Sequence, residues 1–293
     1  MTATFHIITL LSLNAMLVLS CALRATLRMR MQRSFDDVLV AFDRVRGHVG
    51  GMSAASSAPA PARPLRAVLF DIDGTLFNSD EVHLEVFAEM LAQRGFNGGK
   101  PIDEEFFLER ISGRSNPAIC ADLFPTWSDA EATAFSDAKE ARFRELAAAR
   151  LFELRTRGLD ALLAWLDERQ IPAAAVTNAP RANAELMLNA IGRLSWFKTL
   201  VIGDECEHAK PHPEPYEVAM RTLGVEPGDC VAFEDSPSGA RAAVAAGVAT
   251  LGILSTQPAA ALEAAGCEAS VADFTDAALL GYLEQRARCR EAL

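Results

Sequence analysis

The stretch that decides the fold is VLFDIDGTLFNSD, residues 68–80. In it, an apolar run rich in β-forming residues ends in Asp71 and Asp73, and Gly74 follows at once. A short apolar run bounded by Asp and Gly is typical of a buried strand, so residues 66–70 are predicted to form one. The stretch therefore places two carboxylates just beyond the carboxyl end of a buried strand.

After Gly158 the sequence alternates between strand-like and helix-like runs. Strands that alternate with helices of roughly 10–15 residues are typical of a doubly wound parallel sheet. The predicted strands are 172–180, 200–205, 230–235 and 248–254, and the predicted helices are 159–170, 181–192, 214–224 and 236–247.

Between the first strand and this alternating part lies a segment with helical patterns only. Residues 81–94 show an apolar face at helical spacing, and further helix candidates are 103–111 and 129–149. The sequence therefore predicts an α/β fold in which a second, helical domain is inserted after the first strand. The predicted domains are an N-terminal segment and linker at 1–64, a core at 65–83 and 153–293, and the helical domain at 84–152.

The N-terminal segment has no Lys, Arg, Asp or Glu from Met1 to Leu23, and its apolar core, residues 7–23, is about long enough to cross a bilayer. Its arginines follow the apolar run rather than precede it, unlike a secretory signal, and would keep the downstream chain in the cytosol. Alternatively, the segment is an organelle-targeting (plastid) peptide, or it is dispensable and the working chain begins at Met52. The expected location is the cytoplasm, with organelle targeting or a membrane anchor as alternatives. The arginines are Arg24, Arg28, Arg30 and Arg33.

Composition narrows the range of partners. The formal net charge is -11, which argues against nucleic acid or an anionic membrane as the main partner. A membrane is an expected partner only if the N-terminal segment is retained. The six cysteines are scattered, with no CxxC pair, which favours reduced thiols. No pattern in the sequence indicates an oligomeric state.

Polar residues follow each of the predicted strands, where ligands bind in open α/β sheets. Thr177 and Asn178 follow the second strand, Lys210 lies beyond the third, and Glu234 and Asp235 end the fourth. Each signal alone is weak, because Thr-Asn often caps a helix and acids often lie at a helix N-terminus. Their joint occurrence, in order, favours one shared site.

Four carboxylates with one lysine need a further cation, since nearby like charges oppose ionisation. Oxygen ligands suit Mg²⁺, and a metal with a lysine is what phosphoryl transfer requires. We expect Asp71 to attack phosphorus and Asp73 to act as general acid and base. The predicted phosphate ligands are Thr177, Asn178 and Lys210, and the predicted metal ligands are Asp71, Asp73 (through its backbone carbonyl), Glu234 and Asp235.

Four segments of the chain, in order, resemble the motifs of the haloacid dehalogenase-like (HAD) hydrolases. They are DIDGTLFNSD, VTNA, AKPHPEPY and FEDSPSGARAAVAAG, and the resemblance spans about residues 65–254. Within the family, the chain looks most like the plant-type broad-range sugar-phosphate phosphatases. The resemblance implies a Rossmann-like parallel sheet core with an inserted small all-helical cap domain, Mg²⁺ as cofactor, and a small phosphorylated sugar or polyol as substrate. It implies hydrolysis of the monoester through an aspartyl-phosphate.

Asp73 distinguishes the chain from the family's dehalogenases, which lack this residue, and from its ion-pumping ATPases, which carry threonine there. A phosphosugar mutase of the β-phosphoglucomutase type stays open, because it shares both aspartates and has a histidine at the spacing of His83. A non-catalytic binding protein on the same fold is the other alternative. The expected specificity residues are His83, Gly113, Arg114 and Asn116, the last standing where the mutase carries arginine.

Overall fold

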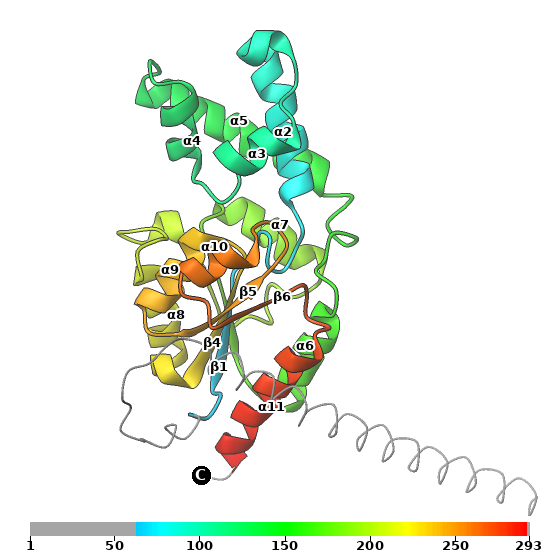
Figure 1. Cartoon of the computed structure of the whole chain (residues 1–293), viewed down its shortest axis with the longest axis vertical. Coiled ribbons are helices and arrows are strands. Elements are labelled where there is room, and N and C mark those ends of the chain that lie inside the picture. Colours follow the sequence, from blue (N-terminus) through cyan, green and yellow to red (C-terminus); the bar gives the residue numbers. More distant parts are fainter. Residues whose placement is uncertain (1–62, 292–293) are drawn as a thin grey trace, which may run out of the picture. The chain divides into compact units, whose positions relative to one another are not determined.

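The computed structural model describes residues 63–291. Its six-stranded sheet is parallel throughout, in the order β3-β2-β1-β4-β5-β6 (Figure 1). The central strand β1 lies between β2 and β4, so the predicted first strand is the middle of the sheet. The strands are β1 (Ala67–Phe70), β2 (Ala173–Thr177), β3 (Thr199–Ile202), β4 (Cys230–Glu234), β5 (Ala249–Ile253) and β6 (Ala269–Val271). The predicted α/β class with a parallel sheet is confirmed.

Helices cover both faces of the sheet, which explains why its strands are apolar along their whole length. They are α6 (Leu159–Glu168), α7 (Arg181–Ala190), α8 (Glu214–Leu223), α9 (Pro237–Ala245) and α11 (Ala277–Glu291). Val68 and Phe70 share a core with α6, α7 and α11, whereas Ala67 and Leu69 share one with α8 and α9. Figure 1 shows α8 and α9 on one side of the strands and α6 and α11 on the other.

The segment after β1 forms the inserted helical cap. It contains α2 (Asp80–Gln93), α3 (Glu104–Arg110), α4 (Asn116–Leu123) and α5 (Asp129–Ala147), and no strand lies within these described residues. Three of these helices agree with the predicted ones to within two residues at each end, whereas α4 was not predicted. Ser128 and Glu131 form a capping box that fixes the start of α5.

Besides α4, three parts of the fold differ from the prediction. The strand predicted at 172–180 is shorter, since β2 ends at Thr177. The strand predicted at 200–205 ends at Ile202, and Gly203–Glu205 is a 3-10 turn. A Cβ on Gly203 would lie 2.2 Å from Asn178 Oδ1, so the chain turns there against the end of β2. Beyond β5, the structure adds α10 (Ala259–Ala264), β6 and α11, none of which was predicted.

Several predictions lie outside the described residues or stay untested. Those on the apolar segment, the linker and Met52 fall within residues 1–62, which the structure does not describe, so the expected location stays a prediction. The cap boundaries at residues 84 and 152 also stay predictions. Within residues 63–291, none of the helices has the length and apolar character needed to span a bilayer. The cysteines of this described part are all free, namely Cys120, Cys206, Cys230, Cys267 and Cys289.

Candidate active site

Lys210 lies at the centre of the polar cluster at the carboxyl ends of the strands. Its Nζ donates to Asp71 Oδ1 at 2.7 Å, to Glu234 Oε1 at 2.6 Å and to the backbone carbonyl of Val176 at 2.7 Å. The side chain is only 3% exposed. Burial alone would lower the pKa of Lys210, but the two carboxylates hold it above its ordinary value. The carboxyl ends of β1, β2 and β4 are thus joined through one ammonium group of the loop that follows β3.

Three buried carboxylates lie together at this site, and two of them contact the lysine. Asp71, Glu234 and Asp235 each offer an oxygen within 4.8 Å of the others. Burial raises the pKa of Asp71 to about 8, against the attraction of Lys210. Burial, followed by the charges of Asp71 and Glu234, raises the pKa of Asp235 well above its usual range. The cluster therefore has more buried negative charge than Lys210 compensates, and its oxygen donors fit a hard divalent cation.

Asp235 is fixed in place by small neighbours. Gly74 has φ +78°, and a Cβ there would lie 2.0 Å from Asp235 Oδ2, so no larger residue fits beside the carboxylate. Thr256 donates to Oδ2 at 2.7 Å, and Thr75 donates to Oδ1 at 3.3 Å. The glycine that follows the two aspartates in the first motif thus makes room for the last acid of the site.

Glu234 is held by a residue to which the sequence analysis gave no role. Tyr216, on the first turn of α8, is fully buried and donates its hydroxyl to Glu234 Oε1, the oxygen that also accepts from Lys210. A Cβ on Gly239 would lie 2.0 Å from the Glu234 carboxylate, which closes the other side. Glu234 therefore positions Lys210. The signal was a tyrosine six residues after the lysine, on the apolar face of a predicted helix.

Asp73 has partners of its own. It accepts from Ser79 Oγ at 2.8 Å and contacts His83 Nε2 at 3.2 Å, and its side chain is 25% exposed. Burial would raise the pKa of Asp73, but the hydrogen bond and charge of His83, together with Ser79, hold it below the ordinary value. The His83 ring stacks on Phe143 of the cap at 4.1 Å. The two aspartates of the first motif thus have pKa values shifted in opposite directions.

The predicted phosphate ligands meet at the end of β2. Thr177 Oγ1 accepts the backbone N–H of Ala179 at 2.9 Å. The side-chain amide of Asn178 pairs with the backbone of Lys210, accepting its N–H and donating to its carbonyl, each at 3.1 Å. Asn178 thus fixes the backbone of the loop that carries the central lysine, and its predicted role toward phosphate stays a prediction.

The predicted specificity residues in the cap lie in different surroundings. The turn at Gly113 faces the core, since a Cβ there would lie 3.6 Å from Ser236 Cβ. The guanidinium of Arg114 instead contacts Asp122 at 2.7 Å and the carbonyl oxygen of Arg110 at 2.8 Å, both within the cap. The structure therefore brings the turn, but not the Arg114 side chain, toward the end of β4.

Asn116 belongs to a buried network that the sequence analysis missed. Its amide donates to Glu140 at 2.6 Å, and Glu140 also accepts from Lys139 at 2.9 Å and from Asn183 of α7 at 2.6 Å. The charge of Lys139 contributes to the lowered pKa of Asp73. The available signal was a lysine in an apolar helix stripe, four residues from both Phe135 and Phe143.

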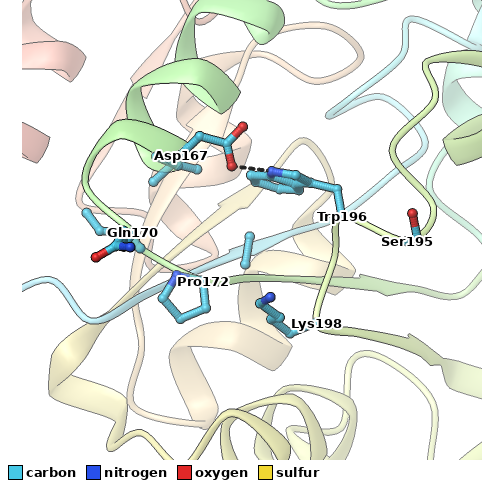
Figure 2. A pocket seen from close by; sticks show the side chains of 9 residues that line it. Asp167, Gln170, Pro172, Ser195, Trp196 and Lys198 are labelled. Atoms are coloured by element: carbon cyan, nitrogen blue, oxygen red, sulfur yellow. Dashed lines mark hydrogen bonds between the residues drawn. The ribbon is translucent and has the colours of Figure 1, made fainter.

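A cavity of about 420 Å³ lies at the opposite, amino end of β2 and β3 (Figure 2). In it, the Trp196 indole donates to Asp167, and Lys198 and Pro172 stand on the facing wall. Asp167 also pairs with Arg193 at 3.4 Å. This cavity lies away from the Lys210 cluster, because β2 begins at Ala173 beside the cavity and ends at Thr177 beside the lysine.

Comparison with known proteins gives consistent matches. A family model described as haloacid dehalogenase-like hydrolase matches residues 65–247. A validoxylamine A 7'-phosphate phosphatase of Streptomyces hygroscopicus subsp. limoneus is 32% identical over 67% of this chain and 89% of its own length. The fructose-1-phosphate phosphatase YqaB of Escherichia coli is 27% identical over 62% of this chain and 92% of its own length. A HAD hydrolase structure from Entamoeba histolytica superposes with a TM-score of 0.65 at 27% identity, covering 76% of this chain and 99% of that one.

Proposed function

Because the chain belongs to the haloacid dehalogenase-like hydrolases, we propose that it is a Mg²⁺-dependent phosphatase that hydrolyses small sugar or polyol phosphate monoesters. The observation that carries the proposal is the contact of Lys210 with Asp71 and Glu234, beside Asp235, at the carboxyl end of the sheet. Two relatives support the substrate class, since one is named a validoxylamine A 7'-phosphate phosphatase and the other a fructose-1-phosphate phosphatase.

Asp71 is the proposed nucleophile. Its carboxylate attacks phosphorus, and the bond to the ester oxygen breaks, which leaves an aspartyl-phosphate and an alcohol. Lys210 contacts Asp71 Oδ1 and can also hold a phosphate oxygen, and Thr177 is the last residue of the neighbouring strand β2. Such positioning, with charge on the transferring oxygens neutralised, is what phosphoryl transfer needs from a protein.

Asp73 is the proposed general acid and base. With a pKa below the ordinary value, it is ready to accept a proton from the water that cleaves the aspartyl-phosphate. For the first step it must carry a proton, and a bound phosphate dianion favours this because like charge nearby raises a carboxyl pKa. His83 orients the Asp73 carboxylate from the cap side.

The metal site would use the carboxylates of Asp71 and Asp235 and the backbone carbonyl of Asp73. Glu234 commits Oε1 to Lys210 and Tyr216, so it stands behind the metal ligands and can offer only its second oxygen. A bound Mg²⁺ would neutralise the charge of the cluster and of the phosphate oxygens.

A phosphate-release screen over sugar, polyol and nucleotide monoesters tests this proposal, with Mg²⁺, with EDTA, and with Asp71→Asn as the background control. We expect release from sugar or polyol esters that EDTA abolishes and Mg²⁺ restores. Release that persists after rigorous metal removal would contradict the metal site. Adding β-glucose 1-phosphate with a bisphosphate primer covers the mutase alternative, for which glucose 6-phosphate accumulates instead of free phosphate.

A further inference from the structure

A second group of metal-binding residues lies on the outer side of the Lys210 loop, apart from the acidic cluster. It consists of His208, His212 and Glu214, whose ligand atoms all lie within 4.8 Å of one another. Two imidazoles and one carboxylate, with a further position left for water, form a donor set found in Zn²⁺ sites. The phosphatase mechanism uses none of these three residues.

One pair in this group already has nearly the spacing that a metal requires. His208 Nδ1 and Glu214 Oε2 are 3.2 Å apart. Bonds of about 2.0–2.2 Å at a tetrahedral angle separate two ligand atoms by about 3.3–3.5 Å. The distance between these two atoms is therefore close to that between two ligand atoms of one metal ion.

The second imidazole is placed alongside the first. The rings of His208 and His212 stack at a centroid distance of 4.4 Å. His212 Nδ1 accepts the backbone N–H of Glu214 at 3.2 Å, a long bond that the ring can exchange for a metal.

The carboxylate is held ready for a cation. Glu214 accepts the backbone N–H groups of Glu207 at 3.0 Å and His208 at 2.9 Å, which lower its pKa and keep it ionised. The His208 side chain is 55% exposed, so an ion and its water can reach the group from solvent. The hydrogen bonds fix the carboxylate in the position that faces the two rings.

We propose that His208, His212 and Glu214 bind a divalent ion of the Zn²⁺ type, at a site distinct from the proposed Mg²⁺ site. Imidazole ligands select Zn²⁺, Co²⁺ or Ni²⁺, whereas the all-oxygen cluster around Asp71 selects a hard cation. The ion joins the Lys210 loop to the first turn of α8 from the outside. It therefore stabilises the loop without entering the phosphate site.

The test is calorimetric titration of the tag-free full chain with Zn²⁺ in the presence of excess Mg²⁺, together with the visible spectrum of added Co²⁺. We expect a binding event whose affinity falls at least about tenfold in His208→Gln and in His212→Gln. Glu207→Gln is the matched control, because Glu207 is exposed on the same loop and contributes only its backbone to Glu214. This variant should bind like the wild type.

Two further measurements keep the result specific. Zn²⁺ at a hundredfold excess over Kd should raise the Tm of the wild type by roughly 5 °C and that of His208→Gln much less. Asp235→Asn should retain the event, since that residue belongs to the other cluster. The proposal is wrong if Zn²⁺ binding is undetectable, if it survives both histidine substitutions, or if Asp235→Asn abolishes it. Without Zn²⁺, His208→Gln should keep its circular dichroism and, with Mg²⁺ supplied, its phosphatase activity.

Discussion

The two ends of β2 differ: one end has a cavity, and the other end has a cluster of buried charged residues. At the amino end, a cavity of about 420 Å³ is lined by an indole, an exposed lysine and an aspartate paired with a surface arginine (Figure 2). At the carboxyl end, three buried carboxylates lie close together, and two of them contact one buried lysine. Uncompensated buried charge persists where function requires it, so it marks the site better than the volume of a cavity does.

The largest expected effect is on kcat, when one aspartate at each end of β2 is replaced by asparagine in turn. Asp71→Asn removes the nucleophile and should lower phosphatase kcat by at least about 10³-fold. Asp167→Asn changes a partly exposed residue of the amino-end cavity and should leave kcat within about twofold. Steady-state phosphate release measures both. Equal losses of kcat in the two variants, or a substantial residual rate in Asp71→Asn, would contradict the assignment of the active site to the carboxyl end.

Two lysines, one at each end of β2, should contribute differently to the stability of the protein. Lys210→Met leaves Asp71 and Glu234 buried without their cation, which should lower the free energy of unfolding by about 3–5 kcal/mol. Lys198→Met removes an exposed lysine of the cavity and should cost no more than about 0.5 kcal/mol. Urea denaturation of the metal-free proteins gives both values. A small loss in Lys210→Met would show that the cluster does not depend on this charge.

The chain has only two tyrosines, and they form a matched pair. Tyr216→Phe removes a buried hydrogen bond to a carboxylate and should lower the free energy of unfolding by about 1.5–3 kcal/mol. The fall in kcat/KM, converted to a free energy, should not exceed this loss. Tyr282 donates to the Glu268 carboxylate at 3.3 Å near the surface, so Tyr282→Phe should cost about 0.5 kcal/mol or less. Denaturation and kcat/KM measure the two effects. If the two variants lose the same stability, Tyr216 does not support Glu234 as described.

The smallest effect concerns Asp73, the acid with partners of its own. In the folded protein the pKa of Asp73 lies below its ordinary value of 3.8. Ionised Asp73 therefore stabilises the fold above pH 3.8, and this stabilisation is lost as the pH falls through the pKa of the folded state. His83→Phe keeps the stack on Phe143 but removes the hydrogen bond, so the pKa of Asp73 rises and the contribution is lost at higher pH.

The acid-unfolding midpoint of His83→Phe should therefore move to higher pH, with about 1 kcal/mol lost at neutral pH. In an Asp73→Asn background, adding His83→Phe should not shift the acid-unfolding midpoint further. A midpoint that shifts equally in both backgrounds would assign the effect to cap packing rather than to Asp73.

The sheet was largely predictable because each of its central strands is an apolar run that ends in polar residues. For the same reason, the residues after β1, β2 and β4 were placed together from sequence. The end of β3 was predicted too late, because the contact of Gly203 with Asn178 joins segments far apart in the chain. The strand β6 has three partly exposed residues, too few to form a pattern.

Side-chain partners were harder to predict than strand ends. Tyr216 reaches Glu234 only once α8 packs on the sheet, and Arg114 turns to Asp122 within the cap. Lys139 lies in an apolar stripe, where its charge is compensated by Glu140 and its ammonium group lies over the rings of Phe87 and Phe143. Such contacts depend on tertiary geometry, which spacing along one helix does not specify.

In the proposed mechanism, Asp71 carries the phosphoryl group during turnover. Rapid quenching of the enzyme with p-nitrophenyl phosphate and Mg²⁺, followed by borohydride reduction and peptide mass spectrometry, tests it directly. We predict homoserine at position 71, its loss when Mg²⁺ is withheld, and none at position 73. Steady phosphate release with an unmodified Asp71, or with the modification at another residue, would contradict the account.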